Sequence, residues 1–214
     1  MDDALANPCI YVLAGTNGAG KSSIGGAAFS VNNAEYFNPD DAARRILSVN
    51  PHIAYSEANS LAWQEGLRLL ERAIAERCDY AFETTLGGKT ITDRLGATLS
   101  SGIQVRVWYA GLRSPELHIA RVQARVARGG HDIPKSKIRE RFDRSRQNLI
   151  RLLPALTELR VYDNSFEADP NAGFAPEPTL VLHVLEGKIV GPDDLTQTPN
   201  WAKPIVAAAM SLGN

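Results

Sequence analysis

The stretch CIYVLAGTNGAGKS, from Cys9 to Ser22, decides the fold. Its first half is a short β-branched and aromatic run that ends in glycine, as a buried parallel strand does. Its second half, GTNGAGKS from Gly15, fits the pattern G-x-x-x-x-G-K-[ST]. Glycines let such a loop turn its backbone N–H groups onto phosphate oxygens. Helical character follows from Lys21, so the positive end of a helix points at the same anion. These features predict a nucleoside triphosphate site.

Two side chains of this loop, Gly15–Ser22, have predicted roles of their own. Lys21 is expected to reach the β- and γ-phosphates, and the hydroxyl of Ser22 to ligate Mg²⁺. The remaining residues present their backbone to the phosphates. The residues expected to bind ATP and its Mg²⁺ are Gly15, Thr16, Asn17, Gly18, Ala19, Gly20, Lys21, Ser22 and Ser23.

Strands and helices alternate along most of the chain. Short apolar runs that indicate strands lie at 34–37, 80–83, 105–110 and 159–163, and helical patterns lie at 56–77, 89–101, 115–128 and 134–153. A further helix opens at Asn38, which can cap it, with Pro39 in its first position. This alternation predicts an α/β fold: a three-layer αβα sandwich of the P-loop NTPase type, with a mainly parallel sheet.

The C-terminal part has a different pattern. TLVLHVLEGKIV, residues 179–190, predicts a β-hairpin that turns near Glu186, Gly187 and Lys188. The tail from Pro192 is expected to pack as a short helix or as coil. Because no repeat or linker interrupts the sequence, we expect one P-loop kinase-like domain over residues 1–214. It would carry a helical lid at about 114–154 and the hairpin and tail at about 178–214.

Composition narrows the class of protein. The chain has 214 residues, of which 44% are hydrophobic and 22% charged, with a net charge of −1, which suits one folded domain. It lacks an apolar run of the ~18 residues that a membrane helix needs, and its first residues are acidic, unlike a signal peptide. Cys9 and Cys78 are too few for a disulfide framework or a thiolate zinc site. We therefore expect a cytoplasmic protein. Trp63, Trp108 and Trp201 are either core or cleft residues, with the core as the default for all three.

Basic residues gather in one segment. Between Arg121 and Arg151 there are ten Lys and Arg against three Asp and Glu, and the rest of the chain is acidic. The segment is either a solvated helical face or a site for an anionic ligand. Its two predicted helices are joined at Gly129-Gly130 and carry arginines at 121, 125, 128, 141, 144 and 146. Such a pair could close as a lid over phosphates and exclude water. His131, in the turn, is expected to form hydrogen bonds in the loop rather than to act as a catalyst.

Acidic and hydroxyl side chains follow two of the predicted strands. Asp40 comes just after the second strand, and Glu83, Thr84 and Thr85 come at the end of the third, so both groups fall at the carboxyl edge where α/β sheets bind ligands. A kinase needs a carboxylate to accept the proton of the attacking hydroxyl, and Asp40 is the candidate. It could instead be an acid favoured by a helix dipole. Glu83 could hold the acceptor, orient Mg²⁺-bound water, or serve only as a cap.

Four blocks of sequence together resemble a known family. GTNGAGKS, FNPDDAAR (37–44), FETTLGG (82–88) and RVARGGHDIPKSKIRERFDRSRQNL (125–149) are similar to the zeta-toxin-like P-loop kinases, over residues 9–154. The forms FETTL and GGHDIP resemble the chromosomal predicted-ATPase/kinase branch, in which the acceptor is generally undefined. The resemblance implies an ATP- and Mg²⁺-dependent phosphotransferase. The toxins of the family phosphorylate UDP-N-acetylglucosamine on a sugar hydroxyl.

The resemblance also assigns roles to single positions. It implies that Lys21 and Ser22 serve ATP and Mg²⁺, and that Asp40 is the catalytic base. Glu83 falls where an acid helps to hold the acceptor, with Thr84 and Thr85 beside it. The two residues that it implies contact the transferred phosphate are Arg125 and Arg141.

Three function classes therefore remain. The first is a kinase that phosphorylates a hydroxyl of a small molecule, such as a nucleotide sugar. The second is an NTPase or a polynucleotide-end-modifying enzyme that uses the basic segment 121–151. Nucleic acid is disfavoured as a partner because only Phe142 offers a base-stacking ring there. The third is the toxin half of a pair with an antitoxin-like protein partner.

Overall fold

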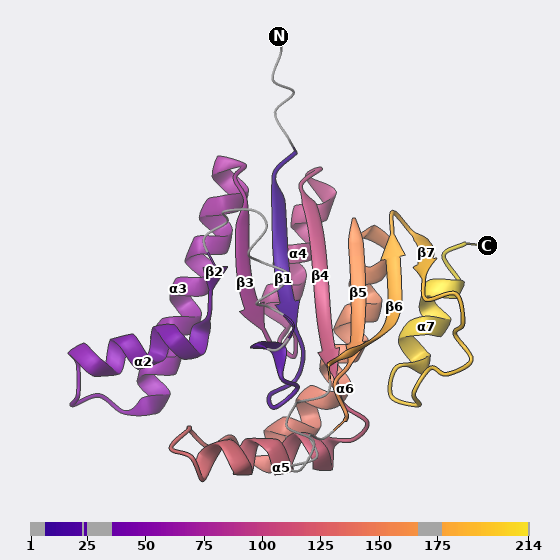
Figure 1. Ribbon diagram of the computed structural model, residues 1–214. Helices are drawn as coiled ribbons and strands as arrows, with labels where there is room; N and C mark the ends of the chain where they lie inside the picture. Colours follow the sequence, from indigo (N-terminus) through magenta and orange to yellow (C-terminus); the bar gives the residue numbers. More distant parts are fainter. Residues whose placement is uncertain (1–6, 23, 25–35, 167–176, 214) are drawn as a thin grey trace.

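The computed structural model describes residues 7–22, 24, 36–166 and 177–213 of the chain (Figure 1). A β-sheet stands in the middle, and α5 lies across the end of the sheet at which the parallel strands finish (Figure 1). Ser23, which was expected to bind the nucleotide, lies outside the described residues.

The sheet, within the described ranges, has seven strands in the order β2-β3-β1-β4-β5-β6-β7. All pairs from β2 to β5 are parallel, and β6 and β7 join antiparallel. The strands are β1 (Cys9–Ala14), β2 (Tyr36–Phe37), β3 (Tyr80–Thr84), β4 (Gln104–Gly111), β5 (Glu158–Asp163), β6 (Thr179–Leu185) and β7 (Lys188–Gly191). The mainly parallel sheet and the C-terminal hairpin are confirmed. The two residues of the hairpin turn both have positive φ, which is the conformation of the tight turn that joins such strands.

The helices begin and end close to their predicted positions. They are α2 (Pro39–Val49), α3 (Tyr55–Glu76), α4 (Lys89–Ser100), α5 (Pro115–Val126), α6 (Lys135–Leu152) and α7 (Lys203–Met210), and a 3₁₀ turn at Leu153–Ala155 follows α6. The side chain of Asn38 caps α2 as predicted, accepting hydrogen bonds from the N–H groups of Asp40 and Asp41 at 2.8 and 3.4 Å. This cap fixes Asp40 in the first turn, at the carboxyl edge of the sheet.

Both faces of the sheet carry apolar clusters, because side chains alternate along a strand. On one face Ile10 and Val12 belong to the main core, which includes residues of α3, α4, α6 and α7. On the other face Leu13 and Trp108 form a smaller cluster that includes Ile24. All six residues of β1 are buried, so the strand that leads into the phosphate loop, Gly15–Ser22, lies at the centre of the domain.

The segment expected to form a lid divides into two parts. Ile119 and Val122 of α5 pack with Ile133 and Ile138 in a small cluster of their own. The last turns of α6 belong instead to the main core, where Leu149 is completely buried. The first half of α6 therefore extends over the carboxyl edge, while its second half is anchored in the core.

The C-terminal tail closes the far end of the sheet. Trp201 packs flat on Gly111, where a Cβ atom would come within 2.2 Å of its ring, and its Nε1 donates to Asp163 at 3.2 Å. The following helix, α7, buries Ile205 and Val206 against the core. No helix in the described ranges is long and apolar enough to cross a membrane.

Two of the three tryptophans are buried, which is the default expectation, and the third is not. Trp108 and Trp201 are 7% and 4% exposed, whereas Trp63 is 45% exposed. α3 turns toward the core a stripe of small residues and leucine, which are Ala58, Ala62, Gly66, Leu70 and Ala73. Trp63 follows Ala62 by one residue, so it lies about 100° further round the helix and leaves the core.

Candidate active site

The phosphate loop turns tightly because its glycines adopt backbone conformations that other residues rarely take. Gly15 and Gly18 have φ of +142° and +80°. A Cβ at Gly15 would lie 2.3 Å from the Ala110 carbonyl oxygen, and one at Gly18 would lie 2.7 Å from that of His118. The loop thus fits closely between β4 and α5. Lys21 and Ser22, its last two residues, are helical.

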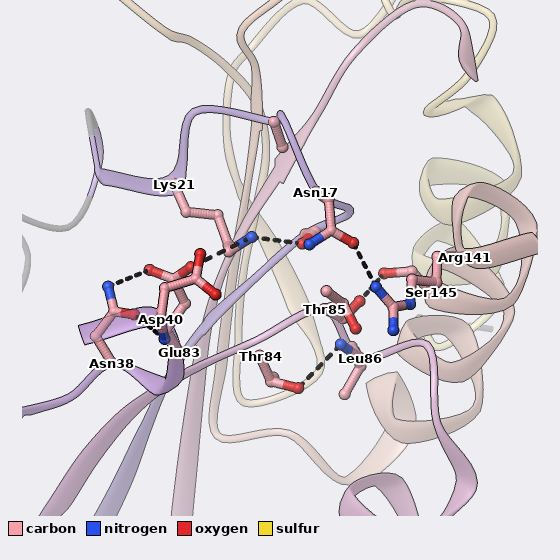
Figure 2. A network of polar contacts seen from close by, with 12 residues as sticks. Asn17, Lys21, Asn38, Asp40, Glu83, Thr84, Thr85, Leu86, Arg141 and Ser145 are labelled. Carbon is pink, nitrogen blue, oxygen red and sulfur yellow. Dashed lines mark hydrogen bonds and ion pairs between the residues drawn. The ribbon is translucent and has the colours of Figure 1, made fainter. Parts of the chain in front are cut away.

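Lys21 is held at the end of β3. It is 8% exposed; its Nζ donates to the Gly15 carbonyl oxygen at 2.9 Å and lies 3.4 Å from Oε1 of Glu83. The other oxygen of Glu83 accepts from the Tyr36 hydroxyl at 3.1 Å and from Nδ2 of Asn38 at 3.4 Å. Figure 2 shows this polar chain from Asn38 through Glu83 to Lys21 of the phosphate loop. A buried cation with one carboxylate partner is suited to receive phosphate oxygens.

Two helices hold Asn17, at the tip of the loop. Nδ1 of His118 on α5 donates to the Asn17 carbonyl oxygen at 2.9 Å, and Nη1 of Arg141 on α6 donates to its Oδ1 at 2.8 Å (Figure 2). Burial lowers the pKa of His118 to about 4, so this ring is neutral at pH 7. Burial also lowers the pKa of Arg141 from its ordinary value. The Arg141 guanidinium therefore already reaches the phosphate loop.

Asp40 faces two residues of the segment between α5 and α6. Its carboxylate oxygens lie 3.6 Å from Nη1 of Arg125 and 3.8 Å from Nε2 of His131. Arg125 also donates to the His131 carbonyl oxygen at 3.3 Å, and the His131 ring stacks on Tyr55 at 4.6 Å. Burial, the largest effect, lowers the pKa of His131, and Asp40 opposes it. The base predicted from sequence and one predicted phosphate-binding arginine are thus in contact.

The β3–α4 loop, taken together with the last residue of β3 as residues 84–88, is tied to α6. The hydroxyls of Thr84 and Thr85 accept the N–H groups of Leu86 and Gly87, at 3.1 and 3.4 Å. The Thr85 carbonyl oxygen accepts a hydrogen bond from the completely buried Ser145 at 2.7 Å (Figure 2). These contacts shape the loop from within.

One cavity of about 750 Å³ joins these groups. Asn17 and Arg141 line it on the side of the phosphate loop, and Asp40 and Glu83 line it at the carboxyl ends of β2 and β3. Further lining comes from the β3–α4 loop, from the loop before α6, and from the face of α3 that carries Trp63. The cavity is therefore large enough for a small acceptor next to a phosphate site.

The sequence of the chain matches the model of the zeta toxin family over residues 2–168. The chain belongs to the zeta toxin family. An uncharacterized protein of Haemophilus influenzae is 30% identical over 139 residues, which are 64% of this chain and 94% of that protein.

Solved structures share the fold of this zeta toxin family protein. The AvrRxo1-ORF1:ORF2 crystal structure with ATP superimposes with a TM-score of 0.62 at 16% identity, over 95% of this chain. The chain spans 64% of the length of that protein. A structure from the PezAT chromosomal toxin-antitoxin system of Streptococcus pneumoniae gives 0.57 at 13% identity, over 98% of this chain and 88% of the other. Family and fold together support a P-loop kinase, and they confirm the predicted fold class and family.

The structure brings nearly all the predicted site residues of this family member to one edge of the sheet. Lys21, Asp40, Glu83, Arg125 and Arg141 lie there together. Thr84 and Thr85 line the cavity, although their hydroxyls are engaged within their own loop. The Ser22 side chain is exposed at the start of the helix.

At least six of the ten Lys and Arg residues in the basic segment form ion pairs with neighbouring acids. Glu140 alone pairs with both Lys137 and Arg144, at 3.1 and 2.6 Å. The segment's other ion pairs join Arg125 to Asp40, Arg139 to Glu116, Arg146 to Asp143 and Arg151 to Asp93. Much of this segment is thus a salt-bridged helical surface, which was one of the two interpretations of its charge.

Sequence reasoning missed the residues that hold the site in place. His118 and Ser145 are buried polar residues that bond the phosphate loop and the β3–α4 loop, and Asn164 donates to the Ala19 carbonyl oxygen at 2.9 Å. Ser145 lies within the block 125–149 but was given no role there, and His118 and Asn164 belong to no motif. The only signal was a polar residue at a position that helix or strand periodicity assigns to the interior.

Proposed function

We propose that this protein is an ATP- and Mg²⁺-dependent kinase that moves the γ-phosphoryl group of ATP to a hydroxyl of a small molecule. Asp40 is the general base, and Lys21, Arg125 and Arg141 act on the transferred phosphate. Glu83 holds the acceptor from the end of β3, helped by Thr84 and Thr85 in the β3–α4 loop.

One observation carries the proposal: the Asp40 carboxylate and the tip of the phosphate loop open into the same cavity. Asn17 marks the phosphate end of the cavity, and Arg141 is bonded to it at 2.8 Å. An acceptor hydroxyl placed at Asp40 would therefore face the terminal phosphate. Asp40 is held there by the Asn38 cap and, at 3.6 Å, by Arg125.

The proposed transfer is a single in-line displacement. The acceptor O–H bond breaks as its proton passes to the Asp40 carboxylate, and the freed oxygen bonds to the γ-phosphorus. The bond from that phosphorus to the bridging oxygen breaks at the same time, and ADP leaves. Charge spreads over the three equatorial oxygens, and Lys21 and the two guanidinium groups are the cations of this site that can stabilise it. Arg125, which pairs with Asp40, is placed to contact both the base and the transferred phosphate.

The residues present fit a Mg²⁺ ion that arrives with the nucleotide. The described ranges contain no cluster of three or more His, Cys, Asp or Glu residues suited to hold a metal by themselves. Mg²⁺ prefers phosphate oxygens, water and one or two protein oxygens, and the exposed Ser22 offers a hydroxyl at the loop. When bound, the ion would neutralise the phosphate charge.

For the acceptor we propose a nucleotide sugar such as UDP-N-acetylglucosamine, on the strength of the family. We further propose an antitoxin-like protein partner, because similar structures come from a toxin-antitoxin system and from a two-protein complex. A polynucleotide substrate has less support, because at least six of the ten Lys and Arg residues in the basic segment already pair with acids.

The test is transfer of label from γ-labelled ATP with Mg²⁺ into nucleotide sugars and a small-metabolite extract. Asp40→Asn should retain ATP binding and lose transfer by about 10²–10⁴-fold. Asp41→Asn is the matched control: Asp41 lies on the same helical turn but pairs with Arg44 and does not line the cavity. Label released only as free phosphate, equally in the parent and in Asp40→Asn, would indicate an NTPase and remove Asp40 from the mechanism.

A further inference from the structure

A row of side chains on α3 forms one wall of the cavity beyond Asp40. Tyr55, Asn59 and Trp63 follow one another at intervals of four residues, and all three line the cavity. Residues at this spacing share a helix face, and eight residues advance by roughly 12 Å. We infer that this row, and Trp63 above all, binds the part of the acceptor that lies away from the reacting hydroxyl. The inference rests on the proposed kinase function.

Trp63 has the exposure and the position of a binding platform. It is 45% exposed, while the two other tryptophans are buried. A single exposed apolar residue needs no explanation in itself. Trp63, however, lies in a cavity wall, on the same face as Ser56, Asn59 and Ser60, whose polar groups can bond the edge of a ring that stacks on the indole. Aromatic platforms with polar neighbours bind flat rings in this way.

Tyr55 supplies a second observation, at the Asp40 end of the row. Its hydroxyl oxygen is buried and forms no hydrogen bond of good geometry within the described ranges, although the Asn59 side chain lies close enough to act on it by hydrogen bonding. Burial raises the pKa of Tyr55, and Asp40 raises it further, while the nearby Asn59 side chain lowers it. The phenol therefore keeps its proton and can donate it in a hydrogen bond. Buried hydroxyls are usually bonded, so this one keeps a donor in the wall beside Asp40, which an oxygen of the acceptor reaches when the ring turns toward the cavity.

The charges around the row indicate which acceptor chemistry fits. Tyr55, Asn59 and Trp63 are neutral, as are the serines between them. Across the cavity, Lys137 and Arg144 of α6 share the carboxylate of Glu140, at 3.1 and 2.6 Å. The neutral row thus favours an uncharged ring with polar edge atoms, while the net positive charge of Lys137, Arg144 and Glu140 opposite suits an anionic group elsewhere on the acceptor. The acceptor would carry such a ring about 10 Å from its reacting hydroxyl, a span that the length of the row sets.

The experiment pairs transfer kinetics with tryptophan fluorescence on the full chain. The probes are UDP-N-acetylglucosamine, N-acetylglucosamine, uridine and the ring-free polyol sorbitol. We expect Trp63→Ala to raise KM about tenfold or more for a ring-bearing acceptor, with kcat and the KM for ATP within about twofold, since stacking holds ground and transition states alike. Trp63→Phe should recover most of the affinity. Leu61→Ala is the control, because Leu61 is 42% exposed on the same helix and does not line the cavity.

Fluorescence separates this inference from the proposed function. The difference in emission between the parent and Trp63→Phe reports Trp63, and a ring-bearing probe should shift it while sorbitol does not. A shift without transfer in the parent would support the row and count against the kinase. Transfer with an unchanged KM in Trp63→Ala and no shift would overturn the row and leave the kinase standing. No shift with any probe would also overturn the row.

Discussion

Ser145→Ala should destabilise the protein and loosen the acceptor side of the cavity, because Ser145 bonds in two directions. Its hydroxyl donates to the Thr85 carbonyl oxygen at 2.7 Å and accepts from the Tyr109 hydroxyl at 3.0 Å. Ser145 is completely buried, and Tyr109 is 2% exposed. Water cannot easily replace the lost oxygen, so the substitution leaves one acceptor and one donor without a partner.

The size of the effect follows from the two partners. A buried group left unsatisfied costs about 1–3 kcal/mol. Thr85 is only half-buried. Burial raises the pKa of Tyr109 to about 12, and the nearby Thr16 hydroxyl opposes this effect by hydrogen bonding to the Tyr109 hydroxyl. Both factors reduce the cost, so we expect about 2–4 kcal/mol in total. For a chain of this length that lowers Tm by roughly 5–15 °C.

A double-mutant cycle with thermal melts measures it. Tyr109→Phe alone should cost about 1 kcal/mol, and in the Ser145→Ala background it should cost nothing or restore stability, because it removes the orphaned hydroxyl. Ser136→Ala, at an exposed position of the same helix, should change Tm by less than about 2 °C. A Ser145→Ala melt that matches this control, or additive effects in the cycle, would refute the reasoning.

Two further predictions concern Gly18 and His118, whose contact holds α5 on the phosphate loop. Gly18→Ala should lower the free energy of unfolding, measured by chemical denaturation, by about 2–5 kcal/mol, because the backbone is strained at φ +80° and the new Cβ would lie 2.7 Å from the His118 carbonyl oxygen. Gly129→Ala is the control: at φ +90°, with no atom within 4 Å of the new Cβ, it should cost only about 1–2 kcal/mol. Equal losses of stability in Gly18→Ala and Gly129→Ala would show that the loop does not pack tightly against α5. The pKa of His118 is about 4 in the folded protein, below its value in the unfolded chain. As the pH falls, the unfolded chain therefore binds the proton first, and the free energy of unfolding should fall by about 3 kcal/mol between about pH 6.5 and pH 4. The free energy of unfolding measured across this range should lose most of that slope in His118→Gln, and an unchanged slope would assign it to other groups.

The elements that the sequence predicted best are those that local chemistry determines. The Asn38 cap and Pro39 fixed the start of α2, and the glycines fixed the phosphate loop, because each acts within a few residues. Placing Asp40 and Glu83 at one edge needed only the parallel order of the strands. The fold class, and the meeting of these residues at one edge of the sheet, were therefore predictable from motifs and alternation.

Contacts between distant segments were not predictable in the same way. Arg141 bonds a residue 124 positions away in the phosphate loop, and Ser145 bonds one 60 positions away. The helical pattern of α6 does not distinguish Arg141 from the other arginines of that helix, which pair with acids. Trp63 was misplaced for a related reason: the buried stripe of α3 consists of small residues, so the largest apolar side chain was not the one facing the core.

α6 links the two halves of the site more directly than a separate lid would. Arg141, Ser145 and Asn148 recur at intervals of four and three, so they lie on one helix face. The first bonds the phosphate loop, and the other two bond backbone carbonyls of the β3–α4 loop, at 2.7 and 2.8 Å. Leu149, one residue on, is completely buried in the main core. Because one anchored helix holds both loops, the distance from the phosphate site to the acceptor side of the cavity is set by the rigidity of α6. A shift of this helix would move both loops together.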